Sequence, residues 1–194
     1  MFLNANSSIA YEKDFESRRD VTLKGEAFFE VAHNPQKPFT VTSGAIKTCV
    51  LGTSFNINSS EKMTIIGVKT GKVAVKSTNN PQKRAVLTKN QQIVFEAGKT
   101  TKITRVDGLD ITAWTRNEIV LNQTSLLETA KLLENQYDVT IDFEDESLKN
   151  YTLSGKFKDE KLENVLSSIA LLKNLTIEYL TPKHILIRKK IQQS

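Results

Sequence analysis

The sequence is poor in the side chains from which catalytic sites, metal sites and disulfides are built. Its 194 residues include one cysteine, Cys49, and two histidines, His33 and His184. A single cysteine cannot form a disulfide within the chain, and its neighbours Val50 and Leu51 favour a small buried side chain over a reactive thiol. No motif of a phosphate-binding loop, a zinc protease or a serine hydrolase occurs. The sequence therefore predicts no enzymatic activity, no cofactor and no metal.

The acidic run Asp142–Glu146 is the strongest candidate for a metal site. Calcium takes six to eight oxygen ligands from a loop that wraps back on itself. This run lacks the glycine and the later glutamate of a calcium-binding loop, so we expect a solvated loop after a strand.

Long apolar runs are missing as well. No uninterrupted apolar stretch approaches the roughly 18–20 residues that a membrane-spanning helix needs, and the N-terminus lacks the basic and apolar segments of a signal peptide. The net charge is a mild +5, and in the first half of the chain the lysines are scattered singly through strand-like sequence. No basic helix, aromatic RNA-binding strand or Cys/His finger accompanies them. The sequence predicts no nucleic-acid partner and no membrane span.

The first 111 residues have the pattern of an all-β domain. Short segments that suit strands recur at intervals of about 8–12 residues, for example Ala27–Val31, Ile46–Leu51, Thr64–Val68 and Lys72–Lys76. Turn signals such as Thr70-Gly71 separate them. This spacing predicts a sandwich or a short solenoid-like stack over residues 1–111.

After Trp114 the hydrophobic period changes to that of helices. One helix is predicted with either Thr124 or Ser125 as its N-cap and with Glu128 placed to reach back from the first turn in a capping box. A second has Asp159 as its predicted cap and a buried face formed by Leu162, Val165, Leu166, Ile169 and Leu172.

These helices belong to an internal repeat with a shift of 36 residues, which places Asp138–Phe143 on Asn174–Tyr179. Each copy has the order strand, helix, strand. The repeat predicts a βαβ-repeat domain over residues 112–194, with two helices on one face of a small sheet. The whole chain is therefore predicted to be an α+β protein with two regions.

Three segments of the first region carry a family resemblance: GEAFFEV (Gly25–Val31), KPFTV (Lys37–Val41) and VLGTSFNIN (Val50–Asn58). Together with the opening Phe2–Ser8, they resemble the periplasmic region of FecR-type anti-sigma factors. Those proteins are single-pass inner-membrane regulators of TonB-dependent outer-membrane transducers. The second region is similar to that family's C-terminal subdomain, which is related to the short N-terminal domains of secretins and transducers.

The resemblance implies a function in signalling. The expected partner is the signalling domain of an outer-membrane TonB-dependent transducer, and the expected location is the periplasm. The family's cytoplasmic helical domain, which holds the extracytoplasmic-function sigma factor, has no counterpart in these residues, and neither does its membrane span. Since Met1 stands directly before the periplasmic opening, we expect either a truncated protein or a split gene.

The predicted partner-binding residues lie on the first strand of the second repeat, Tyr151–Phe157. If this strand lies at the edge of a sheet, its backbone can pair with a strand of the partner. We therefore predict Tyr151, Leu153, Lys156 and Phe157 as partner-binding residues.

Two other functions compete with this hypothesis. The β-rich half fits a carbohydrate-binding or envelope-structural domain, which requires exposed aromatic side chains clustered on one face, yet aromatic residues make up only 7% of the chain. Trp114 is either such a platform or packs at the joint between the two regions. A hydrolase requires a deep pocket in which His184 meets an acidic side chain.

Overall fold

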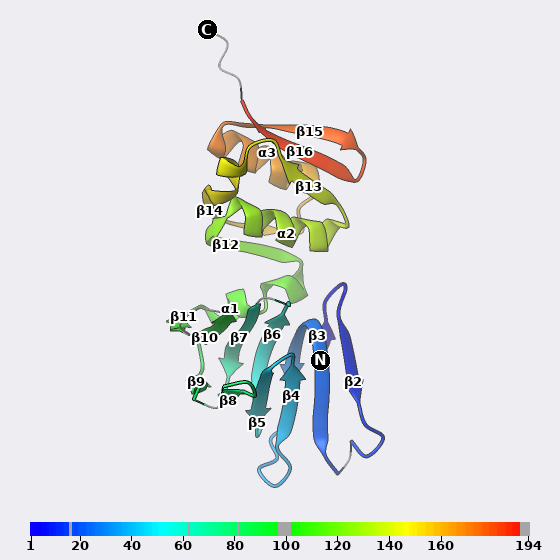
Figure 1. Ribbon diagram of the computed structural model, residues 1–194, viewed down its shortest axis with the longest axis vertical. Helices are drawn as coiled ribbons and strands as arrows, with labels where there is room; N and C mark the ends of the chain where they lie inside the picture. The colour runs from blue at the N-terminus through cyan, green and yellow to red at the C-terminus, as the bar shows by residue number, and fades with distance from the viewer. Residues whose placement is uncertain (16, 62, 81, 97–101, 191–194) are drawn as a thin grey trace. The chain divides into compact units, whose positions relative to one another are not determined.

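The computed structural model describes residues 1–15, 17–61, 63–80, 82–96 and 102–190. The chain divides into two compact units, a first unit of Met1–Thr115 and a second unit of Arg116–Ser194. The sequence placed this boundary a few residues earlier, between residues 111 and 112. Strands predominate and three α-helices occur among the described residues, which confirms the predicted α+β class (Figure 1).

The first unit consists of strands followed by two short helical turns. Its strands are β1 (Phe2–Leu3), β2 (Ser8–Tyr11), β3 (Arg19–Glu30), β4 (Phe39–Ser43), β5 (Ile46–Val50), β6 (Ser54–Ser59), β7 (Met63–Thr70), β8 (Lys72–Ser77), β9 (Arg84–Thr88), β10 (Gln91–Glu96) and β11 (Lys102–Arg105). Its helical turns are α1 (Gly108–Ile111) and η1 (Ala113–Arg116).

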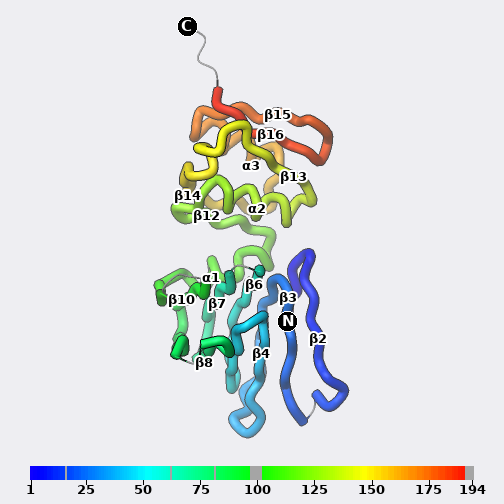
Figure 2. Tube along the Cα trace, viewed as in Figure 1, coloured from blue at the N-terminus to red at the C-terminus, as the bar shows by residue number. Residues whose placement is uncertain are grey.

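The long strand β3 joins two halves of one sheet. Its first half pairs in parallel with β4 and antiparallel with β2, and its second half pairs antiparallel with β6 and β1 (Figure 2). The halves meet at Gly25, whose φ of +84° is open to glycine but strained for other residues. A Cβ on Gly25 would lie 2.3 Å from the Ser7 Oγ, which accepts a hydrogen bond from the Glu26 N–H at 2.8 Å.

The sheet curls into a near-barrel. Its strand order is β11-β10-β7-β6-β3-β4-β5-β8-β9, and β9 at one end contacts β10 near the other. The predicted sandwich or solenoid-like stack is thus replaced by one continuous sheet, because β3 is long enough to run through both halves. Inward-facing side chains of both halves form one core: Val21, Leu23, Ala27, Phe29, Phe39, Val41, Ile46, Val50, Phe55, Ile57, Ile66, Val68, Val73, Val75, Leu87, Ile93 and Phe95.

The second unit contains two small sheets and two longer helices. Its elements are β12 (Glu118–Ser125), α2 (Leu126–Tyr137), β13 (Thr140–Phe143), η2 (Glu146–Asn150), β14 (Thr152–Lys158), α3 (Leu162–Lys173), β15 (Leu175–Thr181) and β16 (His184–Lys189). One sheet is the pair β12-β14 and the other has the order β13-β16-β15. The sequence predicted one small sheet. The strands divide because β16, which lies outside the 36-residue repeat, pairs in parallel with β13 and antiparallel with β15.

The local structure follows the repeat closely. Helix α2 begins with the predicted capping box, in which Ser125 and Glu128 satisfy each other's backbone N–H groups. Both helices end on a left-handed residue, Asp138 in α2 and Asn174 in α3, and these positions are one repeat apart.

Two details of the second predicted helix are wrong. The residue at the N-cap of α3 is Lys161, without a side-chain cap, instead of Asp159. Leu172, expected on the buried face, is 66% exposed, because the core-facing stripe of α3 ends at Ile169. The side chains of α2, α3 and both small sheets nevertheless form one core.

We predict that Gly25→Ala destabilises the first unit far more than Gly44→Ala does. Both glycines have positive φ, but nothing lies within 4 Å of a Cβ on Gly44, whereas one on Gly25 meets Ser7. The backbone conformation alone costs about 1–2 kcal/mol. With the steric conflict, Gly25→Ala should cost about 3 kcal/mol or more. Urea denaturation measures both, and equal losses would show that the bend at Gly25 tolerates a side chain.

Candidate partner-binding site

The ladder of β12 and β14 carries the predicted site. The two strands are antiparallel, with Ile119 opposite Phe157 and Leu121 opposite Gly155. Among the described residues β14 has no other strand partner, so it lies at the edge of its sheet. The predicted site required this strand to lie at a sheet edge, and it does.

The backbone hydrogen bonds at both ends show which groups of β14 face its open edge. The Asp159 N–H donates to the Asn117 carbonyl at 3.1 Å, and the Tyr151 carbonyl accepts from the Leu126 N–H at 2.6 Å. Backbone groups alternate sides along a strand, so the odd-numbered residues of β14 face β12. The N–H and C=O groups of Thr152 and Ser154 therefore point to the opposite edge.

The partner strand β12 is interrupted and offers a poorer template. Its pairing shifts between Leu121 and Thr124, and Gln123 there has a φ of +52°. The Ser154 Oγ holds this bulge by accepting from the Gln123 N–H at 3.0 Å. Because a bulge disrupts a ladder, the regular seven-residue strand β14 is the better edge for pairing with another chain.

The structure divides the four predicted site residues between the core and the surface. Leu153 is 4% exposed in the core of the second unit, and Tyr151 and Phe157 are half-buried against that core. Lys156 is exposed. The sequence correctly predicted that apolar and polar side chains alternate along this strand. The apolar side chains, however, pack on the core of the second unit instead of facing a partner. Pairing through β14 would use its backbone edge and its outward polar side chains.

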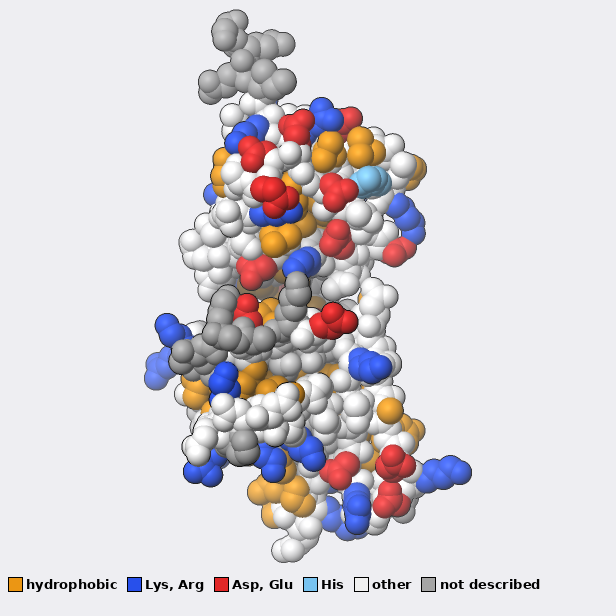
Figure 3. All heavy atoms as spheres, in the orientation of Figure 1, with side chains coloured by type: hydrophobic (Ala, Val, Ile, Leu, Met, Phe, Trp, Pro, Cys, Tyr) orange, Lys and Arg blue, Asp and Glu red, His pale blue; other side chains and the backbone are white. Residues whose placement is uncertain are grey.

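The histidine and the acidic run lie on the surface of the second unit. The His184 Nε2 lies 2.8 Å from the Asp142 Oδ2, with the side chains 38% and 63% exposed. The Lys189 ammonium lies 2.6 Å from the Asp145 carboxylate and, together with hydrogen bonds from Ser147, lowers the pKa of Asp145 to about 2. Figure 3 shows such acidic and basic side chains interspersed on this face.

Asp142 and Asp145 of the acidic run thus form ion pairs with His184 and Lys189 of β16. Glu144 also pairs with Arg188. Within the described ranges no group of three or more His, Cys, Asp or Glu side chains is placed to hold a metal ion. The sequence missed the pair of His184 and Asp142, because only the parallel pairing of β13 and β16 brings them together.

A half-buried carboxylate, that of Glu26, lies in the second half of β3 in the first unit. Burial raises the pKa of Glu26 above its ordinary value of 4.5, against hydrogen bonds from asparagines that lower it. Asn4 and Asn56 each donate to its oxygens at 2.8 Å. The Trp114 Nε1–H donates to the Asn56 Oδ1 at 3.0 Å. Asn56 therefore links the indole of Trp114 to the carboxylate of Glu26 within the first unit.

Exposed aromatic side chains of the first unit are few. Among its described large apolar residues the exposed aromatics are Phe2 and Tyr11, on different strands. The indole of Trp114 is half-buried and hydrogen-bonded. These positions do not form the aromatic platform that a carbohydrate-binding face requires.

Two family models match the sequence. The model described as "FecR protein" matches residues 1–74, and that described as "FecR, C-terminal" matches residues 118–187. A search of curated proteins found no match. Among the helices of the described residues, none is both long and apolar enough to cross a bilayer.

Solved structures agree over nearly the whole chain. Two crystal structures of a candidate anti-sigma factor from Parabacteroides distasonis ATCC 8503, at 1.65 Å and 2.50 Å resolution, are 27% identical to it. Their TM-scores are 0.89 and 0.88, and each alignment covers 97% of this chain and 89% of the other.

We predict that Glu26 makes stability depend on pH in a definite direction. Because its pKa is higher in the folded chain than the ordinary 4.5 of the unfolded chain, the folded state binds this proton more tightly. That contribution is fully present below pH 4.5 and is lost as the pH rises through the raised pKa. The free energy of unfolding of the wild type minus that of Glu26→Gln should therefore increase as the pH falls from about 7.

Denaturant titrations of both proteins at several pH values measure this difference. Glu30→Gln is the matched control, because Glu30 is exposed on the same strand. A difference for Glu26→Gln that stays flat with pH, or that changes no more than the difference for Glu30→Gln, would contradict the prediction.

Proposed function

Because the chain belongs to the FecR family of anti-sigma factors, we propose that it is the periplasmic, signal-relaying region of a membrane-anchored regulator. Members of this family are regulatory proteins. In this proposal the chain binds the signalling domain of an outer-membrane TonB-dependent transducer. The signal reaches an extracytoplasmic-function sigma factor through a membrane span and a cytoplasmic domain that lie outside residues 1–194.

The second unit is the proposed contact, and the edge of β14 is the observation that supports it. An edge strand presents a row of backbone donors and acceptors that a strand of another protein can extend. On β14 this row runs past Thr152 and Ser154, whose side chains are exposed. Leu153 in the core and Phe157 packed against it hold the strand on the second unit. Such a rigid edge binds without the entropy loss of ordering a loop.

The proposed mode also accounts for the outward side chains. Backbone pairing supplies affinity but little discrimination, so neighbouring side chains must select the partner. Lys156, two residues beyond Ser154 on the same exposed row, supplies a positive charge beside the edge. We therefore propose that the transducer strand carries an acidic or acceptor side chain opposite this position.

The direct test is a calorimetric titration of this chain with the isolated N-terminal signalling domain of the transducer encoded beside it. We predict micromolar or tighter binding. Ser154→Pro removes one backbone N–H from the open edge and should weaken binding by about tenfold or more. Ser154→Ala loses the same hydroxyl, and with it the bond to Gln123, but keeps the N–H. It should remain within about threefold of the wild type.

Thermal denaturation and circular dichroism establish that both variants are folded. A folded Ser154→Pro variant with unchanged affinity would remove β14 from the contact. Absence of binding by the unmodified chain would contradict the transducer as partner.

A further inference from the structure

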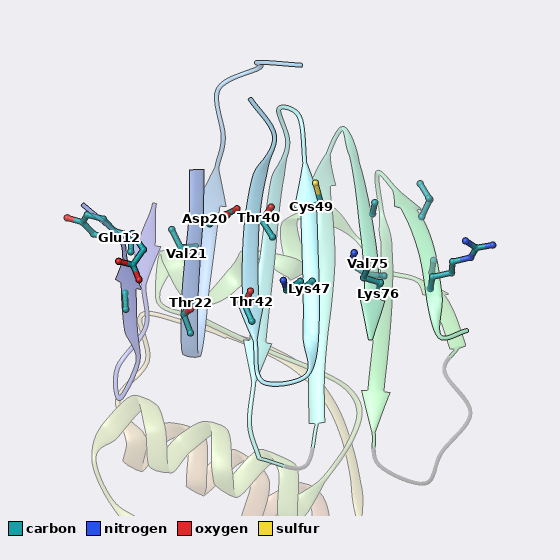
Figure 4. A pocket seen from close by; sticks show the side chains of 16 residues that line it. Glu12, Asp20, Val21, Thr22, Thr40, Thr42, Lys47, Cys49, Val75 and Lys76 are labelled. Atoms are coloured by element: carbon teal, nitrogen blue, oxygen red, sulfur yellow. The ribbon is translucent and has the colours of Figure 1, made fainter. Parts of the chain in front are cut away.

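The first unit carries a groove on the outer face of its sheet that the proposed function does not use. It has a volume of about 1040 Å³ and is lined by strands β2, β3, β4, β5, β8 and β9. Figure 4 shows its labelled side chains standing on neighbouring strands of one face. Apart from Val21 and Val75, which belong to the core, the labelled strand residues are the outward members of the alternation whose inward members form the core.

Three cations stand in a row across this groove. Lys47 on β5 is directly opposite Lys76 on β8, and Lys76 is directly opposite Arg84 on β9. All three are exposed and line the groove. None of these three side chains has an ion-pair or hydrogen-bond partner in the part of the chain that the structure describes. Like charges directly opposite each other on neighbouring strands are destabilising, so the row acts against the stability of the fold.

The groove carries its negative charge on the other side. Asp20 on β3 and Glu12 beyond β2 line it there, and β4 separates β3 from the cations of β5. Two strand spacings separate the backbones by roughly 9–10 Å, and among the described residues neither Asp20 nor Glu12 forms an ion pair with any of the three cations. Between the charges the floor is made of small side chains, Thr40, Thr42, Cys49 and Ala74 among them. The groove is therefore flat in the middle, positive at one side and negative at the other.

From this arrangement we propose that the groove binds an acidic polypeptide segment, with carboxylates on Lys47, Lys76 and Arg84. Carboxylates opposite the cation row would relieve its repulsion. A polypeptide can also place an amine near Asp20 and Glu12, which an anionic glycan cannot do. Among the described residues that line the groove, Tyr11 is the one aromatic residue, so sugar stacking finds little support there. Backbone groups of the segment would hydrogen-bond the hydroxyls of Thr40 and Thr42.

This inference is independent of the edge of β14, since the groove lies in the first unit and none of its residues belongs to the second. Failure of one proposal leaves the other standing. Different variants test the two.

The first experiment measures fluorescence anisotropy of a labelled octaglutamate peptide titrated with the full chain. We expect binding at low ionic strength that weakens about tenfold or more between 20 and 200 mM salt, because the contacts are charge pairs at a surface. Lys76→Gln should weaken binding about fivefold or more. The matched control is Lys72→Gln, four residues away on the same face of β8, where Lys72 is opposite Thr88 and does not line the groove. The control has the same net charge and should bind like the wild type.

Equal weakening by both variants, or no binding of the peptide by the wild type, would overturn the proposal. Dextran sulfate is the second probe. If it binds through Lys76 while octaglutamate does not, the groove is a site for an anionic polysaccharide and the polypeptide is excluded. A peptide that joins two lysines to four glutamates should bind more tightly than one of four glutamates alone, and Asp20→Asn should abolish that gain.

The second measurement is stability without any ligand. Lys76→Gln removes both like-charge contacts of the row, so the melting temperature should rise by about 1–4 °C. Lys72→Gln should change it by less than about 1 °C. A Lys76→Gln variant that is more stable but no longer binds the peptide would support the proposal that the cation row serves recognition. A destabilised Lys76→Gln variant would show that the row does not act against the fold and would overturn the argument.

Discussion

The continuity of β3 is the constraint on which the first unit depends. One strand of twelve residues supplies the ladder for β4 in its first half and for β6 in its second, so both halves of the sheet share a single hydrogen-bonded backbone. The change of direction falls on Gly25, where the added Cβ of any other residue would meet Ser7. The next residue, Glu26, lies on the face of β3 opposite the core residues Ala27 and Phe29. Its partial burial there is tolerated because Asn4 and Asn56 donate to its carboxylate.

In the second unit, β16 lies outside the 36-residue repeat and has the largest effect on how the strands divide into sheets. Two similar βαβ copies could have shared one sheet. Instead β16 lies between β13 and β15 and pairs in parallel with β13. The pair β12-β14 is left as a separate ladder. Since the bulge at Gln123 disrupts β12, β14 has the more regular open edge. The exposed edge is thus a consequence of strand count and bulge position, and the core around Leu153 keeps it in place.

Features that depend on residues close together in the sequence were predicted well, and features that depend on distant residues were not. The capping box at Ser125 and the hydrophobic period of each helix in the repeat depend on residues three or four positions apart, and both are found. The sheets were predicted less well, because strand order is set by pairings between distant segments such as β13 and β16. Alternation on β14 identified its two faces, yet it could not tell that the apolar face of Leu153 was needed inside. The row of Lys47, Lys76 and Arg84 was not predicted, because only the pairing of three strands brings these residues together.

The two surfaces differ in the physics by which each would recognise a partner. An edge strand offers short-range backbone hydrogen bonds, which need a complementary strand and respond weakly to salt. The cation row acts over about a Debye length and mainly governs the rate of encounter and the choice of sign. Ionic strength therefore separates the two kinds of recognition. For a ligand of the cation row, raising it should slow association much more than it speeds dissociation, because the encounter depends on long-range charge. For a strand bound at the edge of β14, both rates should change little.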